Sequence, residues 1–249
     1  MAGAANRADG RRPEALRPLQ ITPRYLTQAE GSALITLGRT WVVCTASIEA
    51  RVPPFLQNSG QGWITAEYDM LPRATHTRRP RAANLGRPSG RTQEIQRLIG
   101  RSLRAVVDLN ALGERSIILD CDVLQADGGT RTAAITGAFV ALCEALALLQ
   151  RREEIDTIPV LDQVVAVSVG LVHDRILVDL DYQEDSRAEV DANFVVTGRG
   201  ELVEVQATGE KGSFPANLIL EMLHQAQTAL AHLRQAQEEA LRPWLPLSW

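Results

Sequence analysis

The hydrophobic positions in the first third of the chain form short apolar and β-branched runs, which predict strands rather than helices. Two runs, 34–37 and 41–48, are separated by Gly38-Arg39 and are predicted to pair as a hairpin. A third strand is predicted over 63–70. The following segment, 72–90, contains three Pro, two Gly and no apolar period. It is predicted to be a long loop, and loops of this length are usually functional or disordered.

Helical spacing begins after this loop. Apolar residues recur three or four positions apart from the start signal Ser89-Gly90 onward, which predicts a helix. A strand is predicted over 116–124. Residues 130–149 are apolar on nearly every side of a helix, so they are predicted to form a second helix, buried between sheets. The periodic positions of the first helix are Ile95, Leu98, Ile99, Leu103 and Val106.

Two more hairpins are predicted in the second half of the chain. Strands 160–172 and 175–180 flank the turn His173-Asp174, and strands 190–197 and 202–208 flank a Gly-Arg-Gly turn. Short connections of this kind join antiparallel neighbours, so strand pairing is predicted to be mostly antiparallel.

A last helix is predicted to be capped by Ser213, with Pro215 near its first turn, and to end before Pro243. Hairpins and long helices in this order predict an α+β fold with mixed sheets. The two halves of the chain are alike in element order. The apolar stripe of the last helix consists of Leu218, Met222, Ala226, Leu230 and Leu233.

The composition fits a globular protein. The chain has 249 residues, 45% hydrophobic and 22% charged, and is predicted to be one domain, 1–249, with a polar arm at 1–17 and a tail at 242–249. No apolar run approaches the ~18–20 residues of a membrane span, and the polar N-terminus predicts that there is no secretory signal. The cysteines predict a reduced, cytoplasmic protein, since Cys44, Cys121 and Cys143 show no metal-ligand spacing.

Charge is unevenly distributed, although the net charge is only −4. Residues 1–104 contain 16 Arg and 7 acidic residues, whereas residues 105–249 contain 10 basic and 23 acidic residues. Such polarity is typical of contact with nucleic acid. Guanidinium groups on a loop suit a phosphate backbone, because each can hold phosphate oxygens in a bidentate manner; a solvated surface is the alternative. The arginines of the long loop are Arg73, Arg78, Arg79, Arg81 and Arg87.

Further arginines and glycines lie in or next to the predicted helices. Asp127-Gly128-Gly129-Thr130-Arg131-Thr132 follows a strand and opens a helix, so its free N–H groups, hydroxyl and guanidinium favour an anion. A structural Gly-Gly turn is the alternative. In the first predicted helix, Arg97, Arg101 and Arg104 share the polar face, which suits a solvated or subunit-interface face as well as RNA contact.

An acidic run follows the second hairpin. Carboxylates this dense repel one another unless a cation or an arginine offsets them, so some are expected to bind Mg²⁺ or to have a raised pKa. A solvated acidic loop is the alternative. The four His residues show no ligand spacing and no triad. The run consists of Asp179, Asp181, Glu184, Asp185, Glu189 and Asp191.

Four motifs in the right order resemble bacterial ribonuclease PH, over about residues 7–241. They are Arg11–Pro18, Ser89–Arg101, Asp127–Thr132 and Glu184–Asp191. The family usually opens with Arg-Pro-Asp-Gly, and here Arg7-Ala8-Asp9-Gly10 stands in its place. The tail, with Trp244 and Trp249, has no counterpart in this pattern.

The resemblance implies a ribonuclease PH-like fold with two similar βαβ-type halves. It also implies a phosphate-dependent 3′-to-5′ exoribonuclease that trims tRNA precursors, works reversibly and forms a hexameric ring, a trimer of dimers. Residue by residue, it implies a phosphate site at Arg91 and Gly129-Thr130-Arg131, and essential carboxylates at Asp185 and Asp191, one or both of which would bind Mg²⁺. It implies tRNA contacts at Arg73, Arg78 and Arg81.

Two other functions remain open at this point. One is a catalytically silent RNA-binding subunit of an exosome-like ring, which would be expected to lose the Arg and Asp set that this chain keeps. The other is a hydrolytic nuclease, which needs an activated water and no phosphate site.

Overall fold

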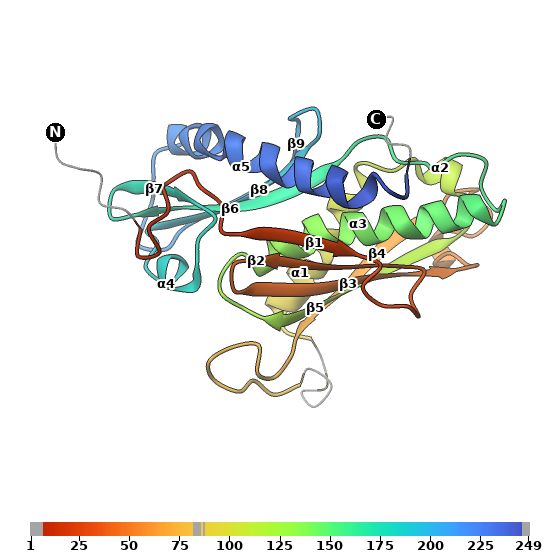
Figure 1. Cartoon of the computed structure of the whole chain (residues 1–249), viewed down its shortest axis with the longest axis horizontal. Coiled ribbons are helices and arrows are strands. Elements are labelled where there is room, and N and C mark those ends of the chain that lie inside the picture. Colours follow the sequence, from red (N-terminus) through yellow and green to blue (C-terminus); the bar gives the residue numbers. More distant parts are fainter. Residues whose placement is uncertain (1–6, 82–85, 87, 246–249) are drawn as a thin grey trace.

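Two β-sheets pack around a long central helix (Figure 1). The computed structural model describes residues 7–81, 86 and 88–245. The strand order is β1-β2-β3-β5-β4 in the first sheet and β7-β6-β8-β9 in the second. The strands are β1 (Leu19–Pro23), β2 (Gly31–Leu37), β3 (Thr40–Glu49), β4 (Trp63–Met70), β5 (Ser116–Gln125), β6 (Val164–Val172), β7 (Arg175–Val178), β8 (Val190–Thr197) and β9 (Leu202–Gly209). The helices are α1 (Gly90–Arg104), α2 (Leu109–Leu112), α3 (Thr130–Arg151), α4 (Tyr182–Asp185) and α5 (Asn217–Leu241), with a 3₁₀ turn at Pro54–Leu56.

The first sheet confirms the predicted hairpin and contains one parallel pair. β2 and β3 pair antiparallel, with Leu37 opposite Thr40 across the Gly38-Arg39 turn. β4 pairs parallel with β5, because α1 crosses between them and returns the chain in the same direction. This half therefore contains a βαβ unit. The three pairings of the second sheet are all antiparallel.

The helix α3 is the core of the molecule, as its all-round apolar pattern predicts. It packs against β2 and β3 on one side and against β6 on the other, so it lies between the two sheets. By length and composition it is apolar enough to cross a membrane, but nearly all of it is buried inside the fold, which is the property of a core helix. Cys44 on β3, Cys121 on β5 and Cys143 on α3 itself are all buried.

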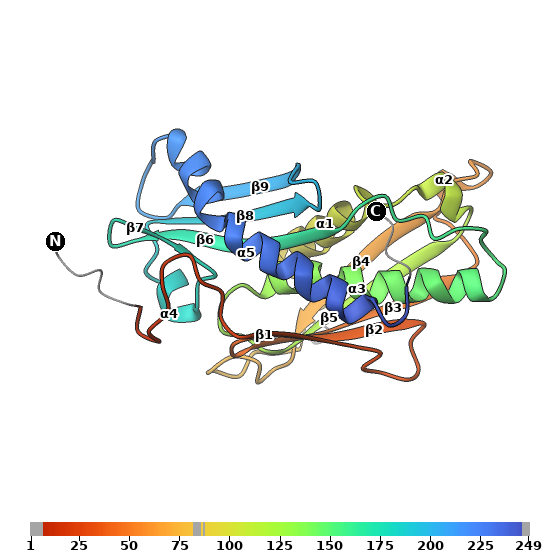
Figure 2. The same cartoon turned by 45° about the horizontal axis from the view of Figure 1, so that its top comes forward.

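The second sheet carries α5 along one face (Figure 2). The predicted stripe from Leu218 to Leu233 is buried against this sheet. The predicted start of the helix is wrong, because Ser213 does not cap it. The helix begins at Asn217, after Ala216, and Pro215 lies before its first turn. Its end at Leu241 agrees with the prediction from Pro243.

The sequence pattern did not reveal β1, α2 or α4, which have only five, four and four residues. Residues 7–17, expected as an arm outside the core, lie against the second sheet, and Arg7 and Arg17 are buried. The rest of the predicted arm, 1–6, and the end of the predicted tail, 246–249, lie outside the described residues. So does Arg87 of the predicted loop.

Candidate active site

A cavity of about 800 Å³ brings together the predicted phosphate-binding and carboxylate residues. It is formed where the N-terminus of α3 meets α4 and the start of β8. The predicted site residues that line it are Arg91, Gly129, Thr130, Arg131, Asp185 and Asp191. They come from α1, α3, α4 and β8, so segments about 100 residues apart in the chain meet at one place.

The N-terminus of α3 faces this cavity without a side-chain cap. Gly129 is its N-cap residue, in a left-handed conformation with φ of 64°, and no side chain caps the first turn. The N–H groups at the start of a long helix and the helix dipole together favour an anion. Gly128 also has a positive φ of 79°, and a Cβ atom there would lie 2.8 Å from the carbonyl carbon of Asp181. Only glycine allows this loop to approach the start of α4 so closely.

A buried tyrosine orients the Thr130 hydroxyl. Tyr68, on β4, donates a hydrogen bond of 2.8 Å to Thr130 Oγ1. Burial raises the pKa of Tyr68 to about 12, so its hydroxyl stays protonated and acts as the donor. The Thr130 proton is therefore left for another acceptor at the cavity. The sequence did not reveal Tyr68, since nothing in the chain pattern shows that the end of β4 meets the start of α3.

The two predicted phosphate-binding arginines differ in their surroundings. Arg131 is held in place, since its Nη1 lies 3.2 Å from Glu94 Oε1 and 2.9 Å from Gln206 Oε1. Arg91, in the first turn of α1, is exposed and forms no ion pair with any described residue. Its guanidinium is therefore available to an anion, and that of Arg131 is oriented by two partners.

The two carboxylates in the cavity resist ionisation. Burial raises the pKa of Asp185, and Arg91 and Arg131 act in the opposite direction. Burial, together with the nearby Asp185 carboxylate, raises the pKa of Asp191 to about 6 despite the same two arginines. A divalent cation would offset this repulsion. Among the described residues no group of three or more His, Cys, Asp or Glu side chains is arranged to hold a metal, so this pair would need substrate or water ligands as well.

Three of the other four carboxylates of the acidic run, all except Glu189, have partners elsewhere in the structure. Asp179 is buried in ion pairs with Arg17 and Arg11, and Glu184 pairs with Arg7. Asp181 caps α4, with its side chain accepting from the Glu184 N–H at 2.9 Å. In a run that looks uniform in the sequence, the structure thus separates three structural carboxylates from the two that face the cavity.

The loop arginines lie outside the cavity lining. Arg73, Arg78 and Arg81 are exposed on the loop that projects from the body below β5 in Figure 1. The same loop reaches the cavity through Arg79 and His76, and the His76 ring lies 6.2 Å from that of Tyr182 on α4. The loop therefore borders the cavity through Arg79 and His76, while Arg73, Arg78 and Arg81 stay outside the lining.

The three arginines on the polar face of α1 also differ in their surroundings. Arg97 is exposed, whereas Arg101 pairs with Glu204 on β9 at 3.0 Å. Arg104 donates to the Ile64 carbonyl at 2.7 Å and stacks on the Trp63 ring. Arg101 and Arg104 therefore hold α1 against neighbouring strands.

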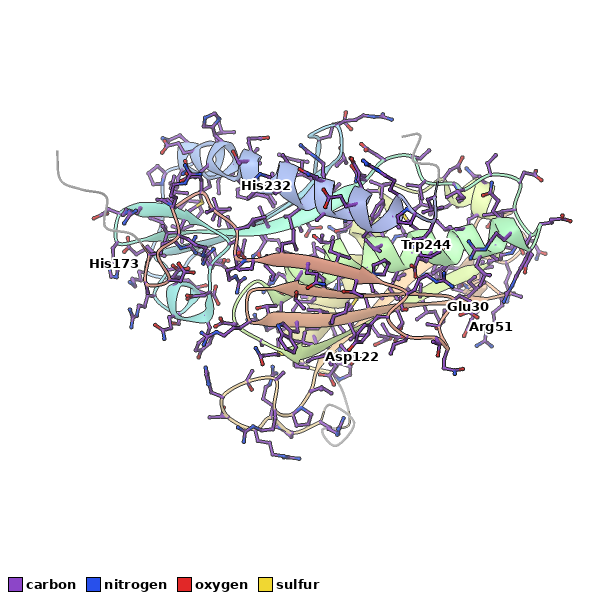
Figure 3. All side chains as sticks on the ribbon, in the orientation of Figure 1. Glu30, Arg51, Asp122, His173, His232 and Trp244 are labelled. Carbon is purple, nitrogen blue, oxygen red and sulfur yellow. The ribbon has the colours of Figure 1, made fainter. Side chains whose placement is uncertain are left out.

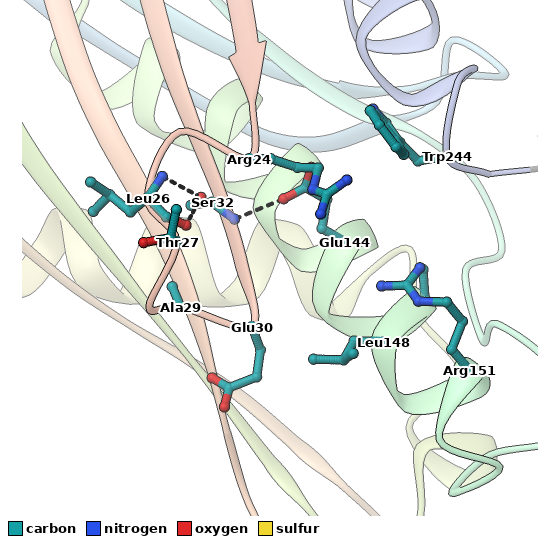
Figure 4. Close-up of a pocket in the computed structure, with 11 residues that line it drawn as sticks. Arg24, Leu26, Thr27, Ala29, Glu30, Ser32, Glu144, Leu148, Arg151 and Trp244 are labelled. Atoms are coloured by element: carbon teal, nitrogen blue, oxygen red, sulfur yellow. Dashed lines mark hydrogen bonds between the residues drawn. The ribbon is translucent and has the colours of Figure 1, made fainter.

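A second cavity, of about 750 Å³, contains none of the predicted site residues (Figure 4). Ser32 N donates to the Glu144 carboxylate there at 2.9 Å, and Arg24 stacks over the Trp244 ring. Two of the histidines lie far from each other: Figure 3 shows His173 at the end of the β6–β7 hairpin and His232 on α5. The first cavity is therefore the one that carries the candidate chemistry.

Comparison with known proteins agrees with this assignment. Two models of the 3′ exoribonuclease family match the chain, domain 1 over residues 15–147 and domain 2 over residues 162–229. A relative named ribonuclease PH, from Moorella thermoacetica, is 58% identical over 235 residues, which cover 94% of both chains.

Solved structures show the same fold. A chain from the Archaeoglobus fulgidus exosome with RNA bound to the active site is 26% identical, with a TM-score of 0.79, and the match covers 93% of this chain and 92% of that chain. A chain of an archaeal exosome core is 23% identical, with a TM-score of 0.72, and the match covers 94% of this chain and 91% of that chain. By sequence over nearly its whole length, and by fold, this chain belongs to the 3′ exoribonuclease family, in the group represented by ribonuclease PH.

Proposed function

We propose that this chain removes nucleotides from the 3′ end of RNA, with tRNA precursors as substrates, by transferring each terminal nucleotide to inorganic phosphate. A phosphate oxygen attacks the phosphorus of the terminal phosphodiester, and the bond to the 3′-oxygen of the preceding nucleotide breaks. The electron pair of that bond goes to the 3′-oxygen, which gains a proton, and a nucleoside diphosphate leaves. The reverse reaction adds nucleotides.

One observation carries this proposal. A single cavity holds an anion-binding helix start, the two predicted phosphate-binding arginines and two carboxylates with raised pKa values. The nucleophile is itself an anion and must approach another anion. Arg91, Arg131 and the N-terminus of α3 would lower that repulsion, and the Thr130 hydroxyl would donate to a phosphate oxygen. The attacking group would in this way be positioned beside the scissile bond.

The two carboxylates would act at the leaving 3′-oxygen, where negative charge develops as the bond breaks. Either Asp185 or Asp191, when protonated, could supply the proton to the leaving 3′-oxygen, since burial keeps the proton bound closer to neutral pH. The pair also fits a Mg²⁺ site of the kind that uses one or two carboxylates together with substrate phosphate oxygens. When bound there, Mg²⁺ would neutralise charge on the phosphoryl oxygens.

The proposed partners are RNA and further copies of this chain, inferred from the family and from the arginines of the loop after β4. RNA is bound to the active site of the Archaeoglobus relative, and we extend RNA binding to this chain through Arg73, Arg78 and Arg81. We also propose a hexameric ring, built as a trimer of dimers from this chain as one domain, in the cytoplasm. In a ring, several copies of the loop would surround one tRNA and add their contacts.

The proposed reaction is tested by RNA trimming with and without inorganic phosphate. We expect the chain to shorten a 3′-extended tRNA only when phosphate is present, and to release nucleoside diphosphates, which chromatography separates from monophosphates. Monophosphates in phosphate-free buffer would instead show a hydrolytic nuclease. Absence of any trimming with phosphate, Mg²⁺ and a bound tRNA would show a silent RNA-binding subunit.

The loop is expected to contribute to tRNA binding separately from the chemistry. Changing Arg73, Arg78 and Arg81 together to Ala should weaken tRNA binding and flatten its salt dependence, by about 0.9 in slope for each duplex phosphate that the loop no longer neutralises. Filter binding at several salt concentrations measures this. Phosphorolysis of a very short oligonucleotide should change little, because these side chains lie outside the cavity lining.

The matched control changes Arg12, Arg51 and Arg152 to Ala, which removes the same charge from exposed positions elsewhere on the chain. This control should leave the salt slope unchanged. Equal losses on tRNA and on the short oligonucleotide in the loop variant would contradict a role in tRNA binding and would indicate that the loop shapes the cavity.

A further inference from the structure

The buried Arg17 side chain joins the two parts of the candidate active site. Arg17 is 5% exposed and Asp179 is 1% exposed. Arg17 Nε and Nη2 donate to the two carboxylate oxygens of Asp179 at 2.9 and 2.6 Å, and the Arg17 backbone N–H donates to the same carboxylate at 2.7 Å. A bidentate, charge-assisted pair of this kind is strong and directional. Asp179 lies between β7 and α4, three residues before the first residue of that helix.

The same guanidinium holds the loop that starts α3. Arg17 Nη1 donates to the Asp127 carbonyl, and Nη2 donates to the Gly128 carbonyl at 3.3 Å. The Thr40 hydroxyl donates to that Gly128 carbonyl at 2.6 Å. Because the C=O and N–H of a trans peptide point in opposite directions, holding these two carbonyls sets the directions of the Gly128 and Gly129 N–H groups. Both glycines line the cavity.

A second arginine of the same segment serves as a comparison. Arg7 is 6% exposed, and its Nε donates to Glu184 Oε1 at 2.7 Å. It also donates to carbonyls of the N-terminal segment and of the end of β7, and to the Asp179 carbonyl at 2.8 Å. Arg7 therefore resembles Arg17 in being buried and in binding a carboxylate. The hydrogen bonds of Arg7, however, lie on the α4 side and do not reach the Gly128 loop.

We propose that Arg17 is a positioning residue for phosphate: by binding Asp179 and the carbonyls of Asp127 and Gly128 together, it sets the orientation of the phosphate-binding loop relative to α4. This inference rests on the proposed phosphate site. The alternative is that the N-terminal segment stabilises the fold and nothing more. The two differ in what Arg17 and Arg7 should each do to phosphate affinity.

The test compares Arg17→Lys with Arg7→Lys in the full chain. Lysine keeps a cation beside the buried carboxylate, so both variants are expected to fold. A single ammonium cannot reproduce the fork of a guanidinium, so the lysine at position 17 cannot bind Asp179 and the loop at the same time. Equilibrium dialysis with radiolabelled inorganic phosphate measures affinity without RNA. We expect the Kd for phosphate to rise about tenfold in Arg17→Lys and less than twofold in Arg7→Lys, while thermal unfolding shows similar losses of stability.

An unchanged phosphate Kd in Arg17→Lys would overturn the proposal. So would an equal rise in both variants, because the segment would then act through the fold as a whole. If Arg17→Lys does not fold, Thr40→Val and Thr40→Ser test the same restraint from the other side of Gly128. The valine variant, which lacks the hydroxyl, should weaken phosphate binding, and the serine variant should retain it; equal affinity in the two would overturn the proposal.

The phosphate-binding measurement also separates the role of Arg17 from the proposed reaction. A wild-type chain that binds phosphate but releases no nucleoside diphosphate from RNA would contradict the reaction, and the Kd values of the two lysine variants would still decide the role of Arg17. A wild-type chain that does not bind phosphate would overturn both.

Discussion

Replacing Asp185 or Asp191 by Asn is expected to lower the turnover number for RNA phosphorolysis by about 10²–10⁴, the range typical of a lost general acid or base. Asn keeps the shape of each side chain and removes its charge and its titrating proton. Both carboxylates line the cavity and both have raised pKa values, so each change should act on the chemical step. Single-turnover trimming of a short oligonucleotide at saturating phosphate measures that step directly.

Two measurements make this result specific. Binding of tRNA should stay nearly intact in both variants, because the loop arginines are unaffected. Glu189→Gln is the matched control: Glu189 belongs to the same acidic run but is not part of the cavity lining, so its turnover should remain near that of the wild type. Turnover near wild type in both Asn variants would show that the two carboxylates are only part of a solvated loop.

Replacing Arg91 by Ala is expected to raise the KM for phosphate by about 10- to 150-fold, since a hydrogen bond to a charged group contributes about 1.5–3 kcal/mol. Of the two predicted phosphate-binding arginines in the cavity, Arg91 is the one that forms no ion pair with a described residue, so its removal breaks no ion pair. Stability should therefore change little. Initial rates of phosphorolysis over a range of phosphate concentrations measure the KM.

Arg97→Ala is the control for this prediction. Arg97 lies on the same helix and is also exposed, but it does not line the cavity. Its loss should leave the KM for phosphate unchanged, although it removes the same charge. A phosphate KM that is equal in Arg91→Ala and in the wild type would exclude Arg91 from the phosphate site.

Local pattern determined most of the element types. The hairpins at Gly38-Arg39 and His173-Asp174 and the long apolar helix 130–149 follow from alternation, turn chemistry and apolar runs, all of which act between near neighbours. The prediction was wrong at the start of α5, because Ser213 satisfies the cap pattern while the chain turns into the helix four residues later. Elements of four or five residues, such as β1 and α4, are too short to show a hydrophobic period. They form because β1 pairs with β2 and because a capping box holds the first turn of α4.

The sequence alone also indicated the chemistry of the site. An arginine at a helix start, a Gly-Gly-Thr-Arg turn and a cluster of carboxylates each favour particular ligands because of charge and hydrogen-bonding capacity, and these properties belong to the residues wherever they lie. What they cannot show is which members act together. In the acidic run, Asp179, Glu184 and Asp185 lie within seven positions, and the chain pattern does not distinguish them.

Tertiary structure made that distinction. Arg17 and Arg7, from the other end of the chain, neutralise Asp179 and Glu184, whereas Asp185 and Asp191 are left facing Arg91 and Arg131. The physical reason is that Coulomb and hydrogen-bond interactions depend on distance in space, and the packing of α3 between two sheets sets those distances. The sequence determined which groups could bind phosphate, and the fold decided which carboxylates lie beside those groups in the cavity.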